Sequence, residues 1–591
     1  MVMNYIPNHP RPQFTRPSWE NLNGIWDFKF DDQNEGIERQ WNLDFPLDRQ
    51  ITVPFSYETV KSGIGDETFH PVVWYHRTIN PLIDRKTRTL LHFEGSDYQT
   101  MLWVNGQYAG CHTGGYTRFQ FDITEMLKPE NNHITVRVED SNDIMQPRGK
   151  QRWKKENFGC WYVQTTGIWK TVWLEYVPQT YLESVKMTPK LADHSIGLEW
   201  KINREPTGAE IKLRVEILFG NKTVNRAEFP VLGRRGRIVL DVGSVEVSEW
   251  LVEKWSPDHP NLYDIRFELA ENEETTDTVG SYFGMRDIRI DQGNILLNGE
   301  PIYQRLVLDQ GYWKDSGLTP PDEAAIIEDI DKILALGFNG ARKHQKIEDE
   351  RYAFWCDVKG LLLWCEMPSP YAFGDDMAQN FTSQWIEVVK QHYNHPSIIT
   401  WTPFNESWGV PQIKTVRQQQ HFTEAVYHLT KSLDEMRPVI VNDGWEHTVS
   451  DILTLHDYEE LGQAFLKRYQ DNHEGILKNQ VYHSTRKSAF AEGYAYRGQP
   501  VIISEYGGAA FAGGEKGSWG YGNTVETVEQ YIFRINDMTS AIKKLPWVCG
   551  YCYTQITDVQ QEINGLLDAE RRCKADINDI REINLKKDMT A

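Results

Sequence analysis

The sequence has few of the features that mark disulfide-rich, membrane-spanning or nucleic-acid-binding proteins. Its seven cysteines are odd in number and scattered over 591 residues, which does not suit a disulfide framework. No apolar run approaches the roughly 18 residues that a membrane-spanning helix needs. Basic residues are outnumbered, with 63 Lys and Arg against 84 Asp and Glu, for a net charge of −21. This charge argues against nucleic acid or an anionic membrane as the main partner.

Two further features that the sequence lacks bear on the location of the protein and on metal binding. The first 14 residues are polar and proline-rich and lack the apolar stretch of a signal peptide, so we expect a cytoplasmic protein. Cys549 and Cys552 have CxxC spacing but lie in a strand-like run, where residues three apart face opposite sides. We therefore expect free, buried thiols there. No spacing of His and Cys suggests zinc, and we expect neither a metal nor a cofactor.

Aromatic residues, in contrast, are abundant, with 21 Trp, 27 Tyr and 24 Phe. Aromatic rings stack on the C–H faces of sugars, so this composition suits a protein that binds carbohydrate. The cores of β-sandwiches also use Trp and Tyr heavily. Composition therefore favours carbohydrate as the partner only modestly.

Hydrophobic patterning divides the chain into three predicted domains. Residues 13–178 carry short β-rich runs between turn signals, such as Asn105-Gly106, and predict a jelly-roll sandwich. Residues 179–288 continue with alternating strands, such as residues 211–218, and predict an immunoglobulin-like sandwich. Residues 289–591 alternate eight strand-like runs with helical periodicity, which predicts a (β/α)8 barrel.

Two predicted barrel strands end in a glutamate. The fourth ends in Asn405-Glu406 and the seventh in Glu505. The carboxyl ends of barrel strands share one rim, so these groups should face a common pocket. Glycoside hydrolysis needs two such carboxylates, one to attack the anomeric carbon and one to protonate the leaving oxygen. A single strand-end glutamate could merely cap a helix or pair with arginine, but two at matching positions favour catalysis.

The whole chain resembles glycoside hydrolase family 2, whose members include β-galactosidases, β-glucuronidases and β-mannosidases. The order of the three domains matches that family. Residues 166–174 resemble the Gly-Ile-aromatic/basic segment that closes the first domain of the family. Residues 404–407, Phe-Asn-Glu-Ser, resemble its acid/base motif, and residues 503–507, Ile-Ser-Glu-Tyr-Gly, resemble its nucleophile motif.

The resemblance implies roles for particular residues. Glu406 would be the acid/base and Glu505 the nucleophile of a retaining, double-displacement mechanism. Asn405 would hydrogen-bond the sugar 2-hydroxyl. Arg342 and His344 resemble the Arg-x-x-His segment of the family, although here it is one residue shorter. Arg342 could hold the nucleophile and His344 could contact a sugar hydroxyl, or both could be structural.

Other candidates come from the strand count, since they fall at the predicted rim of the barrel. They could grip sugar hydroxyls or be solvated charges: Asp309, Glu366, His456 and Asp457. Two aromatic residues could be stacking platforms or core residues: Trp445 and Tyr553. The glycine-rich residues 507–514 could form a lid over the pocket or a plain flexible loop.

Four departures from the family patterns bear on the sugar that is cleaved. Trp161 falls where well-known members have an aspartate that touches the sugar, so a stacking surface would replace a carboxylate. Residues 562–564, Glu-Ile-Asn, stand where β-glucuronidases carry a carboxylate-binding Asn-x-Lys. Tyr553 replaces a frequent Trp, and residues 306–311 replace the usual Gly-x-Asn-x-His-Glu, which also weakens any carry-over of a magnesium site.

These observations predict a retaining exo-glycosidase that is β-galactosidase-like. The alternatives are a β-glucuronidase or arabinosidase of the same family, a catalytically inactive carbohydrate-binding protein, and a scaffolding role for the sandwiches. Intact Glu406 and Glu505 argue against an inactive barrel. By analogy with the family we also expect a homo-oligomer. A cluster of basic residues could attract an acidic substrate or simply be solvated: Arg148, Lys150, Arg152, Lys154 and Lys155.

Overall fold

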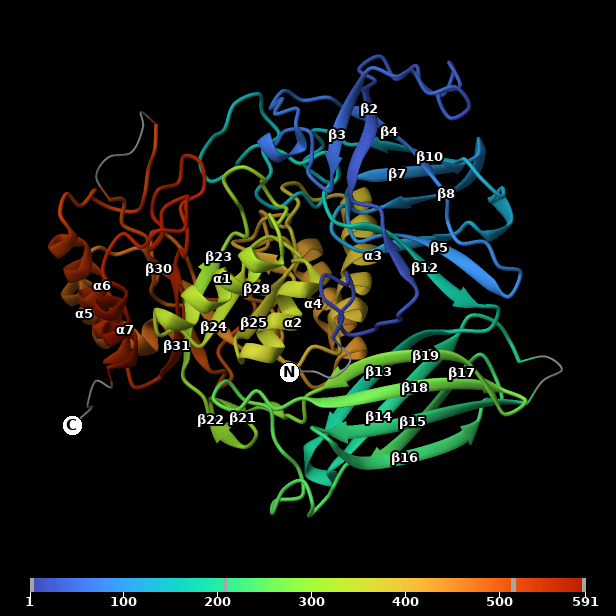
Figure 1. Ribbon diagram of the computed structural model, residues 1–591. Coiled ribbons are helices and arrows are strands. Elements are labelled where there is room, and N and C mark those ends of the chain that lie inside the picture. The colour runs from blue at the N-terminus through green and yellow to red at the C-terminus, as the bar shows by residue number, and fades with distance from the viewer. Residues whose placement is uncertain (1–4, 207–209, 512–516, 587–591) are drawn as a thin grey trace.

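The computed structural model describes residues 5–206, 210–511 and 517–586. In Figure 1 two β-sandwiches, blue and green, lie beside a barrel that runs from yellow-green to red. The predicted fold class is confirmed: a jelly-roll sandwich, an immunoglobulin-like sandwich and a (β/α)8 barrel follow one another along the chain. None of the helices in the described ranges combines the length and hydropathy of a membrane span.

The first sandwich packs a six-stranded sheet on a four-stranded one. The larger sheet has the order β3 (Arg49–Val53), β2 (Gly24–Phe30), β4 (Val72–Ile79), β10 (Asn132–Glu139), β7 (Gln99–Val104) and β8 (Gln107–Thr113). The smaller sheet has the order β1 (Trp19–Asn21), β12 (Val172–Pro178), β5 (Thr87–Phe93) and β9 (Phe119–Asp122). A short ladder joins β6 (Ser96–Asp97) and β11 (Gly167–Ile168). The expected hairpin turn between β7 and β8 is present, with φ of 53° at Asn105 and 79° at Gly106.

The second sandwich is smaller and also antiparallel. One sheet has the order β13 (Leu182–Lys190), β14 (Ser195–Ile202) and β17 (Arg235–Asp241). The other has the order β16 (Lys222–Pro230), β15 (Ile211–Phe219), β18 (Tyr263–Glu271) and β19 (Glu274–Phe283). Strand β15 alternates buried and partly exposed residues over most of its length, as its sequence pattern predicts. Three short strands lead into the barrel: β20 (Ile288–Asp291), β21 (Asn294–Leu297) and β22 (Glu300–Pro301). The sandwiches also contain three single turns of 3-10 helix: η1 (Val60–Ser62), η2 (Thr124–Met126) and η3 (Leu191–Asp193).

The barrel strands are all parallel to their neighbours. They are β23 (Gln304–Asp309), β24 (Gly340–Lys343), β25 (Leu362–Glu366), β26 (Ile398–Thr402), β27 (Phe404–Asn405), β28 (Asn442–Asp443), β29 (Leu453–His456), β30 (Val501–Gly507) and β31 (Val548–Thr554). Only Pro403 separates β26 from β27, and the two together make the fourth of the eight barrel strands. The outer helices are α1 (Glu323–Ala335), α2 (Glu350–Lys359), α3 (Asp375–His392), α4 (Arg417–Leu433), α5 (Gly462–Leu477), α6 (Val528–Lys543) and α7 (Ile577–Leu585).

Alternate residues of the strands point into the barrel and form one apolar cluster. Leu308, Trp364 and Cys552 belong to it and are buried. The residues between them, such as Tyr553, belong to the larger core between the strands and the outer helices. This alternation decides which strand-end side chains can reach the mouth of the barrel. The thiols are free, as expected, although Cys549 is only partly buried.

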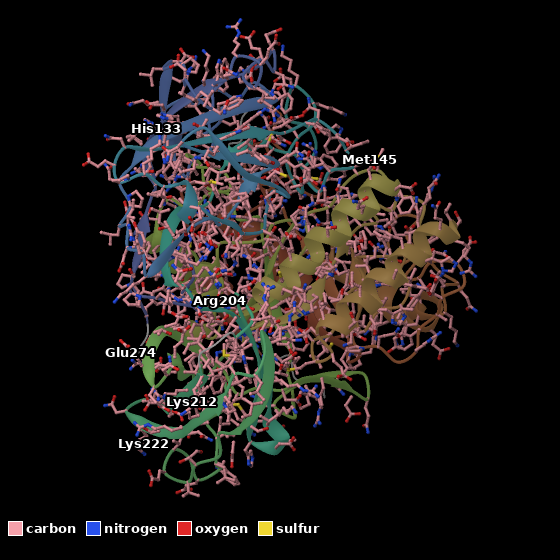
Figure 2. All side chains as sticks on the ribbon, turned by 90° about the vertical axis from the view of Figure 1, so that its right-hand side faces the viewer. His133, Met145, Arg204, Lys212, Lys222 and Glu274 are labelled. Atoms are coloured by element: carbon pink, nitrogen blue, oxygen red, sulfur yellow. The ribbon has the colours of Figure 1, made fainter. Side chains whose placement is uncertain are left out.

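The sandwiches are tied to each other and to the barrel by buried polar contacts. Arg16 donates to Glu175 of β12 at 2.6 Å and to Asp277 of β19 at 2.8 Å, so one guanidinium joins both sandwiches. In Figure 2, Met145 of the jelly roll lies beside the barrel helices, while Lys212, Lys222 and Glu274 project from the second sandwich away from them. The backbone amide of Tyr371, in a barrel loop, donates to the carbonyl of Ile144 at 2.6 Å.

We predict that Arg16→Met lowers the free energy of unfolding by about 3–5 kcal/mol, because it leaves two buried carboxylates without their cation. Arg214→Met is the control, since Arg214 pairs with the exposed Glu228 on the outer sheet, and it should cost less than about 1 kcal/mol. Urea denaturation of both variants measures the difference. Equal losses would show that Arg16 has no special role in joining the sandwiches.

Candidate active site

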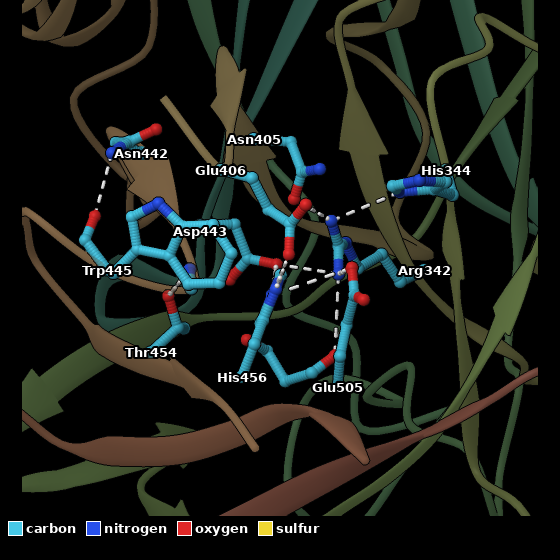
Figure 3. Close-up of polar contacts among 12 residues, drawn as sticks. Arg342, His344, Asn405, Glu406, Asn442, Asp443, Trp445, Thr454, His456 and Glu505 are labelled. Atoms are coloured by element: carbon cyan, nitrogen blue, oxygen red, sulfur yellow. Dashed lines mark hydrogen bonds and ion pairs between the residues drawn. The ribbon is translucent and has the colours of Figure 1, made fainter. Parts of the chain in front are cut away.

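The two strand-end glutamates lie together at the mouth of the barrel (Figure 3). Carboxylate oxygens of Glu406 and Glu505 and a ring nitrogen of His456 all lie within 4.8 Å of one another. The backbone at Glu406 is left-handed, with φ of 51°, which is uncommon for a residue other than glycine. Its amide donates to the carbonyl of Asp443 at 2.9 Å, so the neighbouring strand holds this conformation.

Arg342 lies at the floor of the pocket with no exposed surface. Its guanidinium donates to Glu505 at 2.7 Å and to Glu366 at 2.7 Å, and it forms an ion pair with Asp443 at 2.6 Å. It also donates to the side-chain oxygen of Asn405 at 2.6 Å. Burial by itself would raise the pKa of Glu505, but the charges of His456 and Arg342 lower it. Glu505 is therefore ionised at neutral pH.

His456 bridges the two glutamates. Its Nδ1 lies 2.8 Å from Glu406, and its Nε2 lies 3.0 Å from Asp443 and 3.5 Å from Glu505. Burial favours the neutral ring, yet the charges of Glu505 and Asp443 outweigh it and raise the pKa of His456 to about 10. The ring is therefore an imidazolium at neutral pH, and both of its N–H groups donate to carboxylates.

His344 and Glu366 lie beside Arg342. His344 Nδ1 is 2.9 Å from Glu366 and 3.1 Å from the guanidinium of Arg342. Burial, and then the charge of Lys150, lower the pKa of His344 well below its usual range, so the ring is neutral. Glu366 has no exposed surface and also accepts from the backbone amide and side chain of Gln345. Both residues orient Arg342.

Three sequence candidates lie elsewhere. Asp309 pairs with Lys343 at 2.8 Å, and Asp457 pairs with Arg468 of α5 at 2.6 Å. Tyr553 is 2% exposed and belongs to the core between strands and helices. Asp309 and Asp457 are buried in ion pairs, so both expectations for them, a grip on the sugar or a solvated charge, are corrected. Tyr553 takes the core position that was one of its two alternatives.

The physical reason for this correction is the two-residue period of a strand. Leu308 and Cys552 point into the barrel, so the residue that follows each of them points outward. His456 points into the pocket, and Asp457 after it points toward α5. Each of these three residues is one position from a residue that faces inward.

The remaining aromatic candidates border the pocket. Trp445 makes an edge contact with His456, with ring centroids 5.5 Å apart. Trp161, from the jelly roll, contacts Trp408 at 5.7 Å and Tyr371 at 5.4 Å. Trp161 and the rings around it form what we call the aromatic wall, defined by Trp153, Phe158, Trp161, Tyr371 and Trp408.

Sequence reasoning missed two residues that contact the two strand-end glutamates. Asp443 ends β28 and binds both Arg342 and His456. The rule that selected Glu406 and Glu505 would have found it, because it too is a carboxylate at a strand end. Tyr458 donates its hydroxyl to Glu505 and stacks on Tyr521. Tyr458 follows a strand by two residues, and nothing in the local pattern marks it.

The glycine-rich segment is described only in part. Gly507 and Gly508 have φ of 81° and 69° and end strand β30. Residues 512–514 of the predicted lid or loop lie outside the described residues.

Two groups of side chains in the described ranges have the ligand types of a metal site. One is Glu406, His456 and Glu505, in which the protonated His456 offers no lone pair. The other is Glu350, His392 and His395. There the buried Glu350 is paired with the partly buried guanidinium of Arg118, whose charge opposes a cation. Neither group therefore favours a metal.

Two sandwiches are followed by a barrel with two facing glutamates. This arrangement places the protein in the class of glycosidase-type barrel proteins. Family descriptions match all three parts: glycosyl hydrolases family 2, sugar binding domain, over residues 19–178; glycosyl hydrolases family 2 over residues 180–286; and glycosyl hydrolases family 2, TIM barrel domain, over residues 288–587. The chain belongs to glycosyl hydrolase family 2.

Named relatives carry two kinds of activity. The chain is 25% identical to a β-galactosidase of Leuconostoc mesenteroides over 85% of its own length, and it spans about half, 49%, of that protein. It is 24% identical to the mouse β-glucuronidase over 83% of its length and 78% of the relative. The Lactobacillus rhamnosus β-glucuronidase structure matches the whole chain and is itself wholly covered, with a TM-score of 0.77 at 20% identity, which shows the shared fold.

We predict that His456→Gln lowers stability most at low pH. The pKa of His456 is raised from 6.5 to about 10 in the folded protein. Its stabilising effect is therefore fully present below pH 6.5 and is lost as the pH rises through about 10. Urea denaturation of the wild type and the variant at pH 6, 8 and 10 should show a shrinking difference. His421→Gln, at an exposed site on α4, is the control, and a difference independent of pH for His456→Gln would contradict the bridging role.

Proposed function

We propose that this chain is a retaining exo-β-glycosidase whose partner is a terminal sugar of a carbohydrate. The observation that carries the proposal is the separation of Glu406 and Glu505, whose oxygens approach within 4.8 Å. Retaining enzymes place their two carboxyl groups about 5–5.5 Å apart, whereas inverting enzymes leave roughly 6.5–9.5 Å for a water molecule. The closer spacing suits direct attack by one carboxylate.

Glu505 is the proposed nucleophile. The charges of Arg342 and His456 keep it ionised, and it accepts hydrogen bonds from Arg342 and from the hydroxyl of Tyr458. Its oxygen attacks the anomeric carbon while Glu406 protonates the leaving oxygen. The resulting glycosyl ester no longer carries the charge of Glu505, and Glu406 then takes a proton from the attacking water.

Asn405 is the proposed contact to the sugar 2-hydroxyl. Its side-chain oxygen accepts from Arg342, which fixes the orientation of the amide. Its side-chain nitrogen is buried and has no hydrogen-bond partner among the described residues. A substrate hydroxyl that accepts a hydrogen bond from this N–H would satisfy it. Such a hydrogen bond becomes stronger in the transition state and so stabilises it.

Two kinds of glycone are proposed. A β-galactoside follows from the sequence resemblance and from the name of the Leuconostoc relative. A β-uronide follows from the names of the mouse and Lactobacillus proteins. The aromatic wall, which begins at Trp408 two residues after Glu406, offers a stacking surface for the aglycone. A homo-oligomer and a cytoplasmic location stay as expectations from the sequence.

We predict that Glu505→Ala and Glu406→Ala each lower kcat by at least about 100-fold on the nitrophenyl glycoside that the wild type hydrolyses, since each removes a group of the chemical step. The panel contains β-galactoside, β-glucuronide, β-galacturonide, β-glucoside, β-mannoside, β-fucoside and both arabinosides. Glu474→Ala, at an exposed glutamate of α5, is the control and should match the wild type.

Azide tests the retaining route. With Glu505→Ala, azide can enter the space of the missing carboxylate, and the product should be a glycosyl azide of inverted configuration, identified by NMR. Direct release of the inverted sugar by the wild type would instead overturn the retaining mechanism. Failure of the folded wild type on every glycoside would favour the carbohydrate-binding alternative.

A further inference from the structure

The basic cluster of the jelly roll contains one residue that reaches the catalytic pocket. Arg148 donates to backbone carbonyls of its own loop, and Arg152 donates to Gln164 at 3.0 Å. Lys154 and Lys155 are exposed. Lys150 is also buried, at 5% exposed, but in contrast to these four residues it lies on the barrel side of the loop.

Lys150 is placed by contacts on both sides. Its carbonyl accepts from the amide of Tyr162 at 2.8 Å, which pins the backbone. Its ammonium group lies 5.1 Å from the ring centroid of Trp408, two residues after the acid/base Glu406. Trp408 in turn lies 6.2 Å from the ring of His344. Lys150 therefore lies at the wall of the pocket, near the catalytic residues.

The ammonium group of Lys150 is charged and lacks a carboxylate partner. Burial favours the neutral amine, but Cys160, which also shares a hydrogen bond with it, and Glu562 raise the pKa of Lys150. No described carboxylate forms an ion pair with it. Glu562, a near candidate, is held instead by Tyr162 and by Asn564. A buried charge without an ion pair is costly, and an anionic ligand would compensate it.

The other cations of the pocket are already engaged. The guanidinium of Arg342 pairs with the carboxylates of Glu366, Asp443 and Glu505. These pairs, with its contacts to Asn405 and His344, leave it no free N–H group for the carboxylate of a ligand. His456 donates to Glu406 and Asp443. Lys487, which lies 4.0 Å from the ring centroid of Trp445, also has no ion pair among the described residues, but it is only partly buried. Lys150 is therefore the more buried of two cations beside the site that remain for a ligand.

We propose that Lys150, supplied by the jelly-roll domain, selects an anionic glycone by binding the carboxylate of a terminal β-hexuronide. This inference rests on the proposed glycosidase function and makes the uronide the preferred glycone. A neutral hexose offers Lys150 only hydroxyl groups, which accept weaker hydrogen bonds than a carboxylate does. The sugar-binding domain thus sets specificity, while the barrel carries the reaction.

The test compares matched pairs of substrates that differ in one group. Wild type, Lys150→Met, Lys150→Arg and the control Lys154→Met are assayed on nitrophenyl β-glucuronide with β-glucoside and on β-galacturonide with β-galactoside. We expect Lys150→Met to lower kcat/KM on the preferred uronide by about 30- to 1,000-fold, the loss typical for one partner of a buried charge pair. The matching neutral glycoside should change by less than about threefold, and Lys150→Arg should keep part of the preference.

The outcomes separate this inference from the proposed function. If the wild type hydrolyses only neutral glycosides and Glu505→Ala abolishes this, the glycosidase stands and the role of Lys150 is overturned. Equal losses on charged and neutral substrates would show that Lys150 only supports the pocket. If the wild type hydrolyses nothing, calorimetry with D-glucuronate and D-galacturonate decides. Binding that Lys150→Met removes and Lys154→Met keeps supports the inference, and absence of binding overturns it.

Discussion

The charged cluster at the mouth of the barrel depends on one guanidinium group near the carboxyl end of strand β24. Arg342 has no exposed surface and binds three carboxylates, those of Glu366, Asp443 and Glu505. Without a buried cation these negative groups would repel one another, and at least one would take up a proton. The imidazolium of His456 adds a second positive charge between the two catalytic glutamates. The active site is thus a balanced cluster of charges held by strand ends.

The jelly roll completes the pocket that the barrel begins. Its loop brings Lys150 and Trp161 to the mouth, beside Trp408 of the barrel. Gly149 allows this approach, because its φ is 62° and a side chain there would overlap the carbonyl of Gln345. The chemistry comes from one domain, while part of the pocket wall comes from another.

Much of this arrangement could be predicted from the sequence, because parallel strands bring their ends to one rim. Glu406 and Glu505 follow from that rule, and Asp443 obeys it too. The rule fails for Asp309 and Tyr553, because a shift of one residue along a strand moves a side chain to the opposite face. The run of apolar residues marks where a strand ends but does not show which face its last side chain takes. The place of Lys150 depends on how the domains pack, and no local pattern contains that information.

The loop that carries Lys150 also has an evolutionary consequence. Its residues precede the barrel in the chain and contribute no group to the reacting pair, so mutations there leave the acid, the nucleophile and their supporting charges in place. Under the proposed roles, substitutions in this loop therefore change the preferred sugar one step at a time and leave the reacting groups intact. A rim built from strand ends cannot change so freely, because every one of its charges is shared with a neighbour.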